Sequence, residues 1–240
     1  MPKKNIFITG GTGYLGRHLI PLLLEQGGQV RALVRKGSES KLPPGCTLIL
    51  GNALDEGSFA EAVSPADTFV QLIGVPHPSP SKAREFQDVD LVSVRASVSA
   101  AKKANIRHFV YVSVAQPAPI MKAYQGVRAQ GETLIRKSGL DATILRPWYV
   151  LGPGHRWPYL LIPVYWILKK LPATREGANR MGLLSLSQMI QALNLVIRAG
   201  SHGYQVLDVP RIRELGKTPL FPPGSHKKPQ PTLTRSAGSS

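Results

Sequence analysis

The residues with the clearest chemical purpose form a glycine-rich loop near the start of the chain. Gly10, Gly13 and Gly16 follow the apolar run Ile6–Ile8 and open a segment with helical spacing. Glycine permits a tight turn at the first position, close approach of a phosphate at the second and close helix–strand packing at the third. Free amides at the start of a helix attract anions. This spacing predicts a loop that binds the pyrophosphate of a dinucleotide, in preference to a glycine-rich turn without a ligand.

The next strand indicates which dinucleotide is preferred. A carboxylate about 20 residues beyond the loop is typical of NAD(H) sites, because it binds the ribose 2′-hydroxyl. Here Arg35 and Lys36 end the predicted strand, and no carboxylate follows the first helix until Glu39. A guanidinium can hold a 2′-phosphate through two hydrogen bonds. We therefore expect NADP(H) to be favoured over NAD(H), with a solvated basic strand end as the alternative.

These residues must be positioned by alternating strands and helices, the pattern of a parallel sheet with helices on both faces. The predicted strands are Asn5–Thr9, Gln29–Val34, Thr47–Gly51, Thr68–Ile73, His108–Val114, Ala142–Arg146 and Tyr204–Asp208. The predicted helices are Gly13–Gln26, Ser58–Val63, Phe86–Ala104, Met121–Ser138 and Leu186–Arg198. The expected fold is α/β, a doubly wound parallel sheet of the Rossmann type.

The chain is long enough for one such domain and short for two. We expect an NAD(P)-binding domain over residues 1–215, in which 151–215 form a small cap or substrate region. From 216 to 240 the chain is rich in Pro, Lys and Ser and lacks periodicity, which predicts a disordered tail.

The composition narrows the classes of protein to which this chain can belong. The hydrophobic fraction of 42% and the charged fraction of 18% are those of a globular protein. A single cysteine, Cys46, excludes an internal disulfide and a thiolate cluster, so we expect a cytoplasmic protein with no metal site. No secretory signal opens the sequence, and no apolar run reaches the ~20 residues of a membrane span.

The formal charge of +16 does not by itself predict nucleic-acid binding. From Arg211 onward six Lys/Arg and one Asp/Glu contribute +5, and the remaining +11 is dispersed over the body. Dispersed charge favours anionic ligands in general, whereas nucleic-acid binding proteins concentrate it in patches with aromatic residues. We expect a small-molecule substrate and no nucleic acid; the sequence does not indicate an oligomeric state.

An apolar, aromatic segment spans Trp157–Lys170 and ends in two lysines. One interpretation is a wall of a lipophilic substrate pocket. The other is peripheral membrane contact, since Trp and Tyr favour the headgroup region and lysine favours anionic lipid. Pro163 argues against a continuous amphipathic helix, and the two interpretations are compatible.

Several motifs in order resemble those of the atypical and extended short-chain dehydrogenase/reductases, in particular the NmrA-like and NAD-dependent epimerase/dehydratase-like branch. They are Thr9-Gly10-x-x-Gly13-x-x-Gly16, Tyr111-Val112-Ser113, Leu145-Arg146-Pro147 and Gly152-Pro153-Gly154. The resemblance covers about residues 4 to 210 and implies strand order 3-2-1-4-5-6 with an added edge strand. It also implies these cofactor contacts: Gly10, Thr12, Gly13, Tyr14, Leu15 and Gly16 in the loop, Arg35, Lys36, Asn52 and Ala53 on the adenosine side, Leu72, Ile73 and Gly74 at the adenosine ribose, and Pro147 and Trp148 by the nicotinamide.

Active members of that family carry a Tyr and, four residues later, a Lys that lowers the tyrosine pKa, with a Ser or Thr nearby. The matching positions are Tyr124 and Arg128, with Ser113 as the hydroxyl. Arg128 is cationic but larger and planar, and it does not simply replace lysine. Val114 stands nearer to the place where many members have the serine. Tyr124 as a packing residue is the alternative interpretation.

Three functions remain from these observations. The first is an NADP(H)-dependent oxidoreductase that moves a hydride to or from a small or lipophilic carbonyl or alcohol. The second is a non-catalytic NADP(H)-binding redox sensor or complex-stabilising subunit, which Arg128 and Val114 favour. The third is a sugar-type epimerase or dehydratase, for which the short C-terminal region leaves little room.

Overall fold

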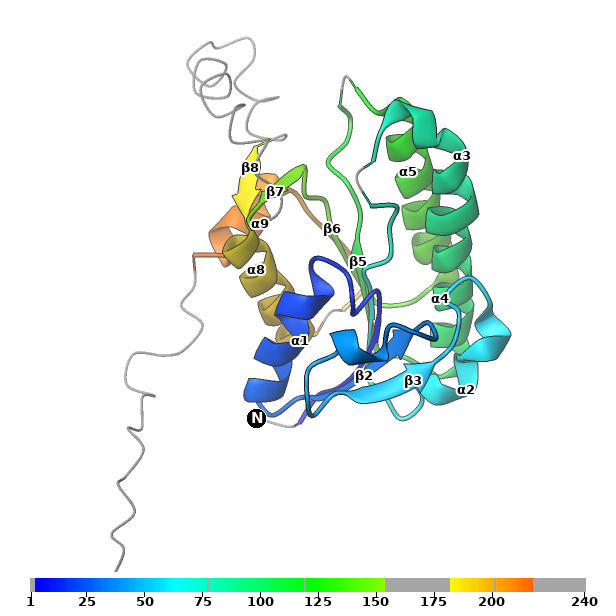
Figure 1. Cartoon of the computed structure of the whole chain (residues 1–240). Coiled ribbons are helices and arrows are strands. Elements are labelled where there is room, and N and C mark those ends of the chain that lie inside the picture. The colour runs from blue at the N-terminus through cyan, green and yellow to red at the C-terminus, as the bar shows by residue number, and fades with distance from the viewer. Residues whose placement is uncertain (1–2, 77, 119, 154–181, 201, 218–240) are drawn as a thin grey trace, which may run out of the picture.

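The structure is a computed structural model that describes residues 3–76, 78–118, 120–153, 182–200 and 202–217. Its centre is a seven-stranded parallel sheet of order β3-β2-β1-β4-β5-β6-β9 (Figure 1). The strands are β1 (Asn5–Thr9), β2 (Gln29–Val34), β3 (Thr47–Leu50), β4 (Thr68–Gln71), β5 (His108–Val112), β6 (Ala142–Leu145) and β9 (Tyr204–Leu207). This order confirms the doubly wound α/β fold and the added edge strand. Trp157–Lys170 and residues 218–240 lie outside the described residues, and the predictions for them stay predictions.

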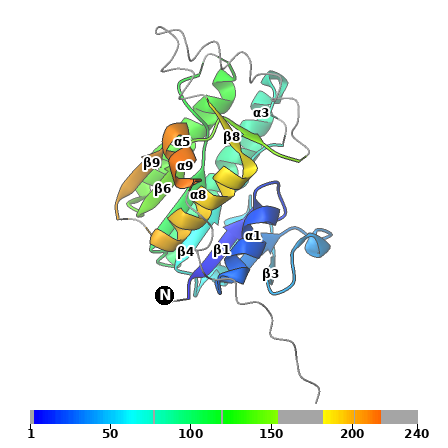
Figure 2. The ribbon, with the colours of Figure 1, turned by 90° about the vertical axis from the view of Figure 1, so that its left-hand side faces the viewer.

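Helices cover both faces of the sheet (Figures 1 and 2). One face carries α1 (Gly16–Glu25) and α8 (Leu186–Ala199), whose apolar side chains share a core cluster with β1 and β2. The other carries α2 (Ala60–Val63), α4 (Val92–Lys103) and α5 (Lys122–Ser138), which pack on Phe7, Phe69 and Phe109. Parallel strands require such crossovers, and right-handed crossovers in both directions from β1 place helices on both faces.

The region before α4 departs from a regular α-helix. We predicted one continuous helix over Phe86–Ala104, but Phe86–Leu91 forms a π-helical segment between α3 (Ala83–Glu85) and α4. Phe86 and Asp90 point into the protein and are 0% and 1% exposed. Segments of this type are rare and occur frequently at functional sites, because they turn side chains to positions that a regular helix does not reach.

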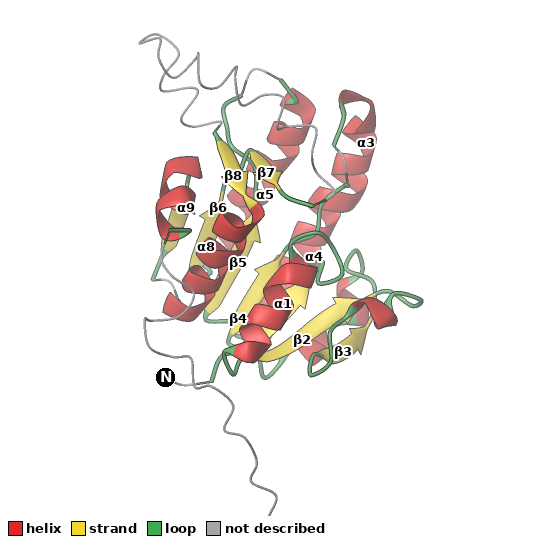
Figure 3. Cartoon of the chain, turned by 60° about the vertical axis from the view of Figure 1, so that its left-hand side comes forward, coloured by secondary structure: helices red, strands yellow, loops and turns green. Residues whose placement is uncertain are grey.

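Beyond β6 the chain forms a second, two-stranded parallel sheet from β7 (Tyr149–Leu151) and β8 (Leu183–Ser185), which was not predicted (Figure 3). The other late elements join the main body. Helix α8 begins with a capping box between Ser185 and Gln188, and α9 (Val209–Leu215) begins at Asp208, which accepts from the Arg211 amide. Short 3-10 turns, η1 (Glu39–Lys41), η2 (Glu56–Ser58) and η3 (Pro80–Lys82), occupy connections.

The direction in which successive strands are added to the sheet reverses between the neighbouring strands β1 and β4. Connections after these strands leave in opposite directions, which opens a crevice at their carboxyl ends where doubly wound folds bind ligands. The loop Gly10–Gly16 and the segment after Gln71 therefore meet in this crevice. No helix in the described part of the chain has the length and apolarity that crossing a membrane requires.

Candidate functional site

The glycine loop has the geometry that its spacing predicts. Gly10 has φ +77°, and a Cβ there would lie 2.9 Å from the Leu72 carbonyl carbon. The Gly13 amide donates to the Gly10 carbonyl at 3.0 Å and closes the turn. A Cβ on Gly16 would lie 2.6 Å from the Gly10 oxygen, so only glycine lets α1 approach the loop this closely. The loop is thus a narrow cradle whose backbone is open to a phosphate.

A pocket of about 450 Å³ opens beside this loop at the carboxyl ends of β1, β4 and β5. It is lined by Gly10, Gly13, Tyr14, Leu15, Arg17, Leu72, Gly74, Val75, Pro76, Val112, Ser113, Tyr124 and Arg128. It therefore brings six of the expected cofactor contacts together with all three candidate catalytic residues. Arg17, Val75, Pro76 and Val112 were not predicted as site residues. The narrow glycine cradle and the adjoining pocket fit the pyrophosphate and nicotinamide parts of a dinucleotide.

The residues expected on the adenosine side stand along the same sheet edge but do not line this pocket. In the β1–β2 register Thr9 is opposite Leu33, so the chain after β2 reaches Arg35 beside the glycine loop. Arg35, Lys36 and Asn52 are exposed, whereas Ala53 is 8% exposed. Asn52 accepts from the Leu54 amide at 3.1 Å, which orders the turn after β3. The exposed cations are accessible to a ligand that extends from the loop over β2.

The other expected contacts differ in their environments. Thr12 lies half-buried in the loop, while Ile73 and Gly74 follow β4, and Ile73 donates its amide to Gln71 Oε1 at 2.7 Å. Buried Pro147 accepts from the Ala115 amide at 2.8 Å, which ties the chain after β6 to that after β5. Trp148 is half-buried against Tyr149, with ring centroids 5.3 Å apart. Their roles as cofactor contacts stay predictions.

Tyr124 lies in the first turn of α5 and lines the pocket half-buried. Phe86 from the π-helical segment packs on its ring at a centroid distance of 5.0 Å. The guanidinium carbon of Arg128 lies 5.1 Å from the same ring. The two residues share one face of α5, as their spacing predicts. Arg128 contacts the face of the Tyr124 ring, so the structure places a cation beneath the aromatic system.

Arg128 is buried and makes contacts on several sides. Its Nη1 donates to the Val112 carbonyl at 3.0 Å and the Tyr111 hydroxyl at 3.2 Å, and reaches the Ile73 carbonyl at 3.4 Å. Its Nη2 forms an ion pair with Asp90 Oδ2 at 3.3 Å. Burial alone lowers the pKa of Arg128, but Tyr111, Tyr124 and Asp90 raise it above its ordinary value. The side chain is therefore a permanent cation that joins the ends of β4 and β5.

Ser113 makes a different connection. Its hydroxyl donates to Glu132 Oε1 at 2.6 Å, and Gln116 Nε2 donates to the same oxygen at 2.8 Å. Arg146 completes the network through Nε at 3.0 Å and through Nη2 to the second carboxylate oxygen. Its hydrogen bonds with Glu132 raise the pKa of Arg146. Since the Ser113 hydroxyl already donates its proton to Glu132, its oxygen can take part in a further hydrogen bond only as an acceptor.

Sequence reasoning missed both carboxylates of these networks, although each had a signal. Asp90 follows Phe86 by four residues and precedes buried Val94 by four, so it falls on the apolar face of its helix. Glu132 follows Arg128 by four residues on the inner face of α5. A charged residue on a buried face needs a partner. The helical spacing therefore points to Asp90 and Glu132 as members of buried ion pairs.

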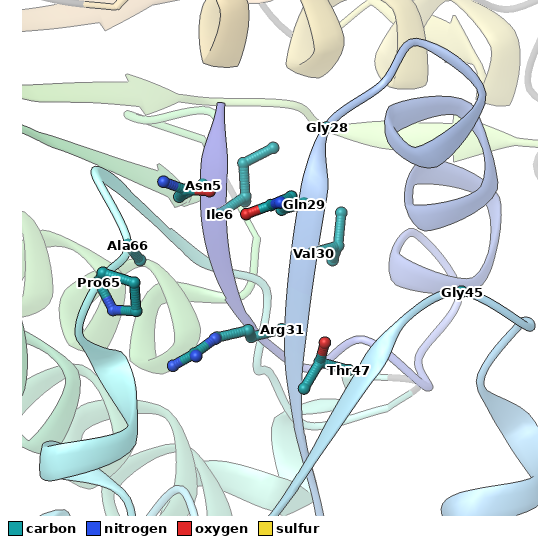
Figure 4. A pocket seen from close by; sticks show the side chains of 10 residues that line it. All are labelled: Asn5, Ile6, Gly28, Gln29, Val30, Arg31, Gly45, Thr47, Pro65 and Ala66. Atoms are coloured by element: carbon teal, nitrogen blue, oxygen red, sulfur yellow. The ribbon is translucent and has the colours of Figure 1, made fainter. Parts of the chain in front are cut away.

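A second hollow, of about 360 Å³, lies at the amino ends of the strands, at the end of the sheet opposite the glycine loop (Figure 4). It is lined by the first residues of three strands, Asn5, Gln29 and Thr47, together with Arg31. The Arg31 guanidinium donates to the Ala62 carbonyl at 3.0 Å and the Ser64 carbonyl at 2.5 Å. The Arg31 guanidinium, the charged group of this hollow, is thus engaged in stabilising the connection between α2 and β4. No group of three His, Cys, Asp or Glu side chains suited to a metal ion occurs among the described residues.

Comparisons with known proteins support binding of a nicotinamide dinucleotide. A family model described as NAD(P)H-binding matches residues 10–155. The chain is 29% identical over 154 residues to a ceramide reductase of Caulobacter vibrioides, covering 62% of this chain and 47% of that protein. It is 27% identical over 168 residues to a 4-hydroxy-2-methyl-3-oxo-4-farnesyl-3,4-dihydroquinoline-1-oxide ketoreductase of Stigmatella aurantiaca, covering 61% and 50%. It is 30% identical over 150 residues to the photosystem II assembly factor Ycf39 of Cyanophora paradoxa, covering 59% and 44%. The matched region is about half the length of these relatives.

Solved structures show the same fold. The enzyme WbmH of Bordetella bronchiseptica, in complex with NAD+, superposes with a TM-score of 0.66 at 24% identity, covering 90% of this chain and 80% of that one. A UDP-glucose 4-epimerase of Thermotoga maritima with UDP-glucose superposes with a TM-score of 0.63 at 18% identity, covering 89% and 81%. These findings confirm the resemblance to extended and atypical short-chain dehydrogenase/reductases.

Proposed function

We propose, since this chain belongs to the NAD(P)H-binding family, that it is an NADP(H)-dependent oxidoreductase acting on a lipophilic carbonyl or alcohol. The observation that carries the proposal is the single pocket that joins the glycine loop to Tyr124, Arg128 and Ser113. Val75 and Pro76 are among its lining residues, and Val75 belongs to an apolar cluster with Phe86. The ceramide reductase and the farnesyl-bearing ketoreductase among its relatives support a lipophilic substrate.

When bound, the reduced nicotinamide would supply a hydride to the carbonyl carbon. Tyr124 would donate its phenolic proton to the carbonyl oxygen, so that hydride and proton together give the alcohol. The Arg128 cation beneath the Tyr124 ring stabilises the phenolate that remains. Ser113, whose proton is held by Glu132, would accept a hydrogen bond from the alcohol and orient it. In the oxidative direction the same groups act in reverse.

For the cofactor, Arg35 and Lys36 support NADP(H). Arg35→Asp is expected to weaken NADPH binding about 30- to 100-fold and NADH binding less than about threefold, because a charged hydrogen bond to the 2′-phosphate is replaced by repulsion. Nicotinamide fluorescence titrations at one fixed ionic strength measure both affinities. Lys102→Asp, at the exposed C-terminal end of α4, makes the same change in net charge far from the site. Equal losses for NADPH and NADH would contradict the placement of Arg35.

For the chemistry, Tyr124→Phe is expected to lower turnover about 100-fold or more while NADPH affinity stays within about twofold, because only the proton donor is removed. The measurement is NADPH oxidation with a panel of long-chain ketones and aldehydes, followed by the same assay on the variant. Unchanged turnover in the variant would remove Tyr124 from the mechanism.

A second candidate is an NADP(H)-binding protein without turnover, such as a redox sensor or a complex-stabilising subunit. The observation that favours it is the engagement of Arg128 with Asp90, Tyr111 and two backbone carbonyls, since these contacts occupy the guanidinium, and no hydrogen bond joins it to Tyr124 in the described part of the chain. The likeness to an assembly factor supports it as well. NADPH binding by the wild-type chain, combined with no oxidation across the carbonyl panel, would select this candidate. An epimerase or dehydratase ranks third, because the likeness to UDP-glucose 4-epimerase extends only to the fold.

A further inference from the structure

The pocket-lining residue Arg128 belongs to a buried charged pair whose acidic member, Asp90, belongs to none of the glycine, tyrosine or serine motifs. The Asp90 side chain is 0% exposed and the Arg128 side chain 4% exposed, so both charges are removed from water. Isolated buried charges are strongly unfavourable, and each of these is compensated by the other. The pair therefore acts as a unit: displacing Asp90 changes the position that Arg128 can occupy.

Asp90 also fixes the segment that follows β4. While Oδ2 faces Arg128, Oδ1 accepts from the Val75 amide at 2.8 Å. A Cβ on Gly74 would collide with Arg128 Nη2, so the guanidinium lies directly beneath this segment. Gly74 and Val75 both line the pocket. One carboxylate thus holds the backbone wall of the pocket and the cation under it in a fixed relation.

Arg128 also fixes a second part of the pocket wall, at the end of β5. Its hydrogen bond to the Val112 carbonyl fixes the end of β5, and its guanidinium lies under the Tyr124 ring. The Arg128 Nε atom is buried and has no hydrogen-bond partner among the described residues. An unsatisfied buried donor on a pocket-lining side chain is a feature that a bound polar group can relieve. The glycine loop lines the same pocket, and under the proposed function its amides would hold the phosphates independently of this unit.

We propose that Asp90 is a positioning residue for the nicotinamide half of the cofactor, acting through Arg128 and the Gly74–Val75 backbone. This inference rests on the proposed function. It separates the site into two parts: the glycine loop and Arg35 hold the adenosine phosphates, and the Asp90–Arg128 unit shapes the region that receives the nicotinamide ribose. In Asp90→Asn the amide oxygen can still accept from the Val75 amide, but an NH2 group replaces the oxygen that faces Arg128, so the guanidinium loses its counter-charge while the adenosine part is untouched.

The test compares two probes on the full chain: NADPH, and adenosine 2′,5′-bisphosphate, which lacks the nicotinamide half. Asp90→Asn is expected to weaken NADPH about tenfold and to leave adenosine 2′,5′-bisphosphate within about twofold. Asp88→Asn is the matched control, because Asp88 lies in the same π-helical segment, with 65% of its side chain exposed in an ion pair with Arg84. It should change neither affinity. A general loss of structure would weaken both probes equally and would overturn the proposal, as would an unchanged NADPH affinity.

If Asp90→Asn does not fold, the double variant Asp90→Asn/Arg128→Met removes both buried charges and keeps the test decisive. It is expected to bind adenosine 2′,5′-bisphosphate like the wild type and NADPH no more tightly than that fragment. Wild-type affinity for NADPH in the double variant would overturn the proposal. If the wild-type chain itself bound NADPH no better than the fragment, the proposed function would fail together with this inference. A wild-type preference retained in Asp90→Asn removes only the role of Asp90.

Discussion

Gly16→Ala is expected to lower NADPH affinity by about 100-fold or more and to lower the free energy of unfolding by about 1–3 kcal/mol. The added Cβ would lie 2.5 Å from Gly11 Cα and 2.6 Å from the Gly10 oxygen. Neither contact can be relieved by rotating a side chain, since both atoms belong to the backbone. The first turn of α1 must move away from the loop, and the amides that face the phosphates move with it. Urea denaturation and NADPH titration measure the two effects.

Gly126→Ala provides the control. Gly126 lies exposed inside α5, and a Cβ there meets nothing within 4 Å. Alanine is the better residue in a helix interior, so this variant is expected to gain about 0.5–1 kcal/mol of stability and to bind NADPH normally. An equal effect of the two substitutions would show that the cradle does not depend on close backbone approach.

Glu132→Gln is expected to lower the free energy of unfolding by about 2–4 kcal/mol, because it leaves the Arg146 guanidinium without its counter-charge. The Glu132 side chain is 6% exposed and that of Arg146 27% exposed, so water replaces the lost interaction only in part. The amide keeps the shape of the carboxylate, which limits the change to charge and hydrogen bonding. Urea denaturation at neutral pH gives the value.

The ion pair of Arg211 with Glu214 is the reference for this measurement. Its side chains are 53% and 66% exposed, and Glu214→Gln is expected to cost less than about 1 kcal/mol. A similarly small loss in Glu132→Gln would mean that the network around Ser113 contributes little to stability. Ser113 donates to Glu132. A large loss of stability in Glu132→Gln would therefore also mean that this buried carboxylate holds the Ser113 hydroxyl in its orientation.

The sheet could be predicted from sequence because each strand is a short apolar run between turn residues. β1 and β2 were predicted to the residue, and the five other strands were predicted only one or two residues too long at their carboxyl ends. Some of those last residues, such as Leu72 and Ser113, line the pocket instead of extending the strand. The prediction failed there because the local pattern does not record where a neighbouring strand stops pairing.

Elements that depend on tertiary contacts were harder to predict. β7 and β8 are three residues each and pair across a long separation, so neither has enough residues to show alternation. Helix α9 was not predicted, although Asp208 at its N-cap and Pro210 in its first turn are both signals of a helix start. The contacts of Arg128 with Asp90, Tyr111 and the strand ends could not be predicted, since spacing along α5 gives a face but not its partners.

The pairing of β7 with β8 has a consequence for how such a protein can change. The two strands run parallel, with Leu151 paired to Ser185 and Leu183 paired to Tyr149, so both ends of the intervening sequence are anchored in one small sheet. A Cβ on Gly152 would collide with the Tyr14 hydroxyl, so the chain just after β7 stands against the glycine loop. The entropy of closing a loop grows slowly with its length, so insertions or deletions between these anchors cost the rest of the domain little. The sequence between Leu151 and Leu183 can therefore vary while the nucleotide-binding half stays the same. Such variation would let descendants of this protein acquire new ligands without a change in the sheet.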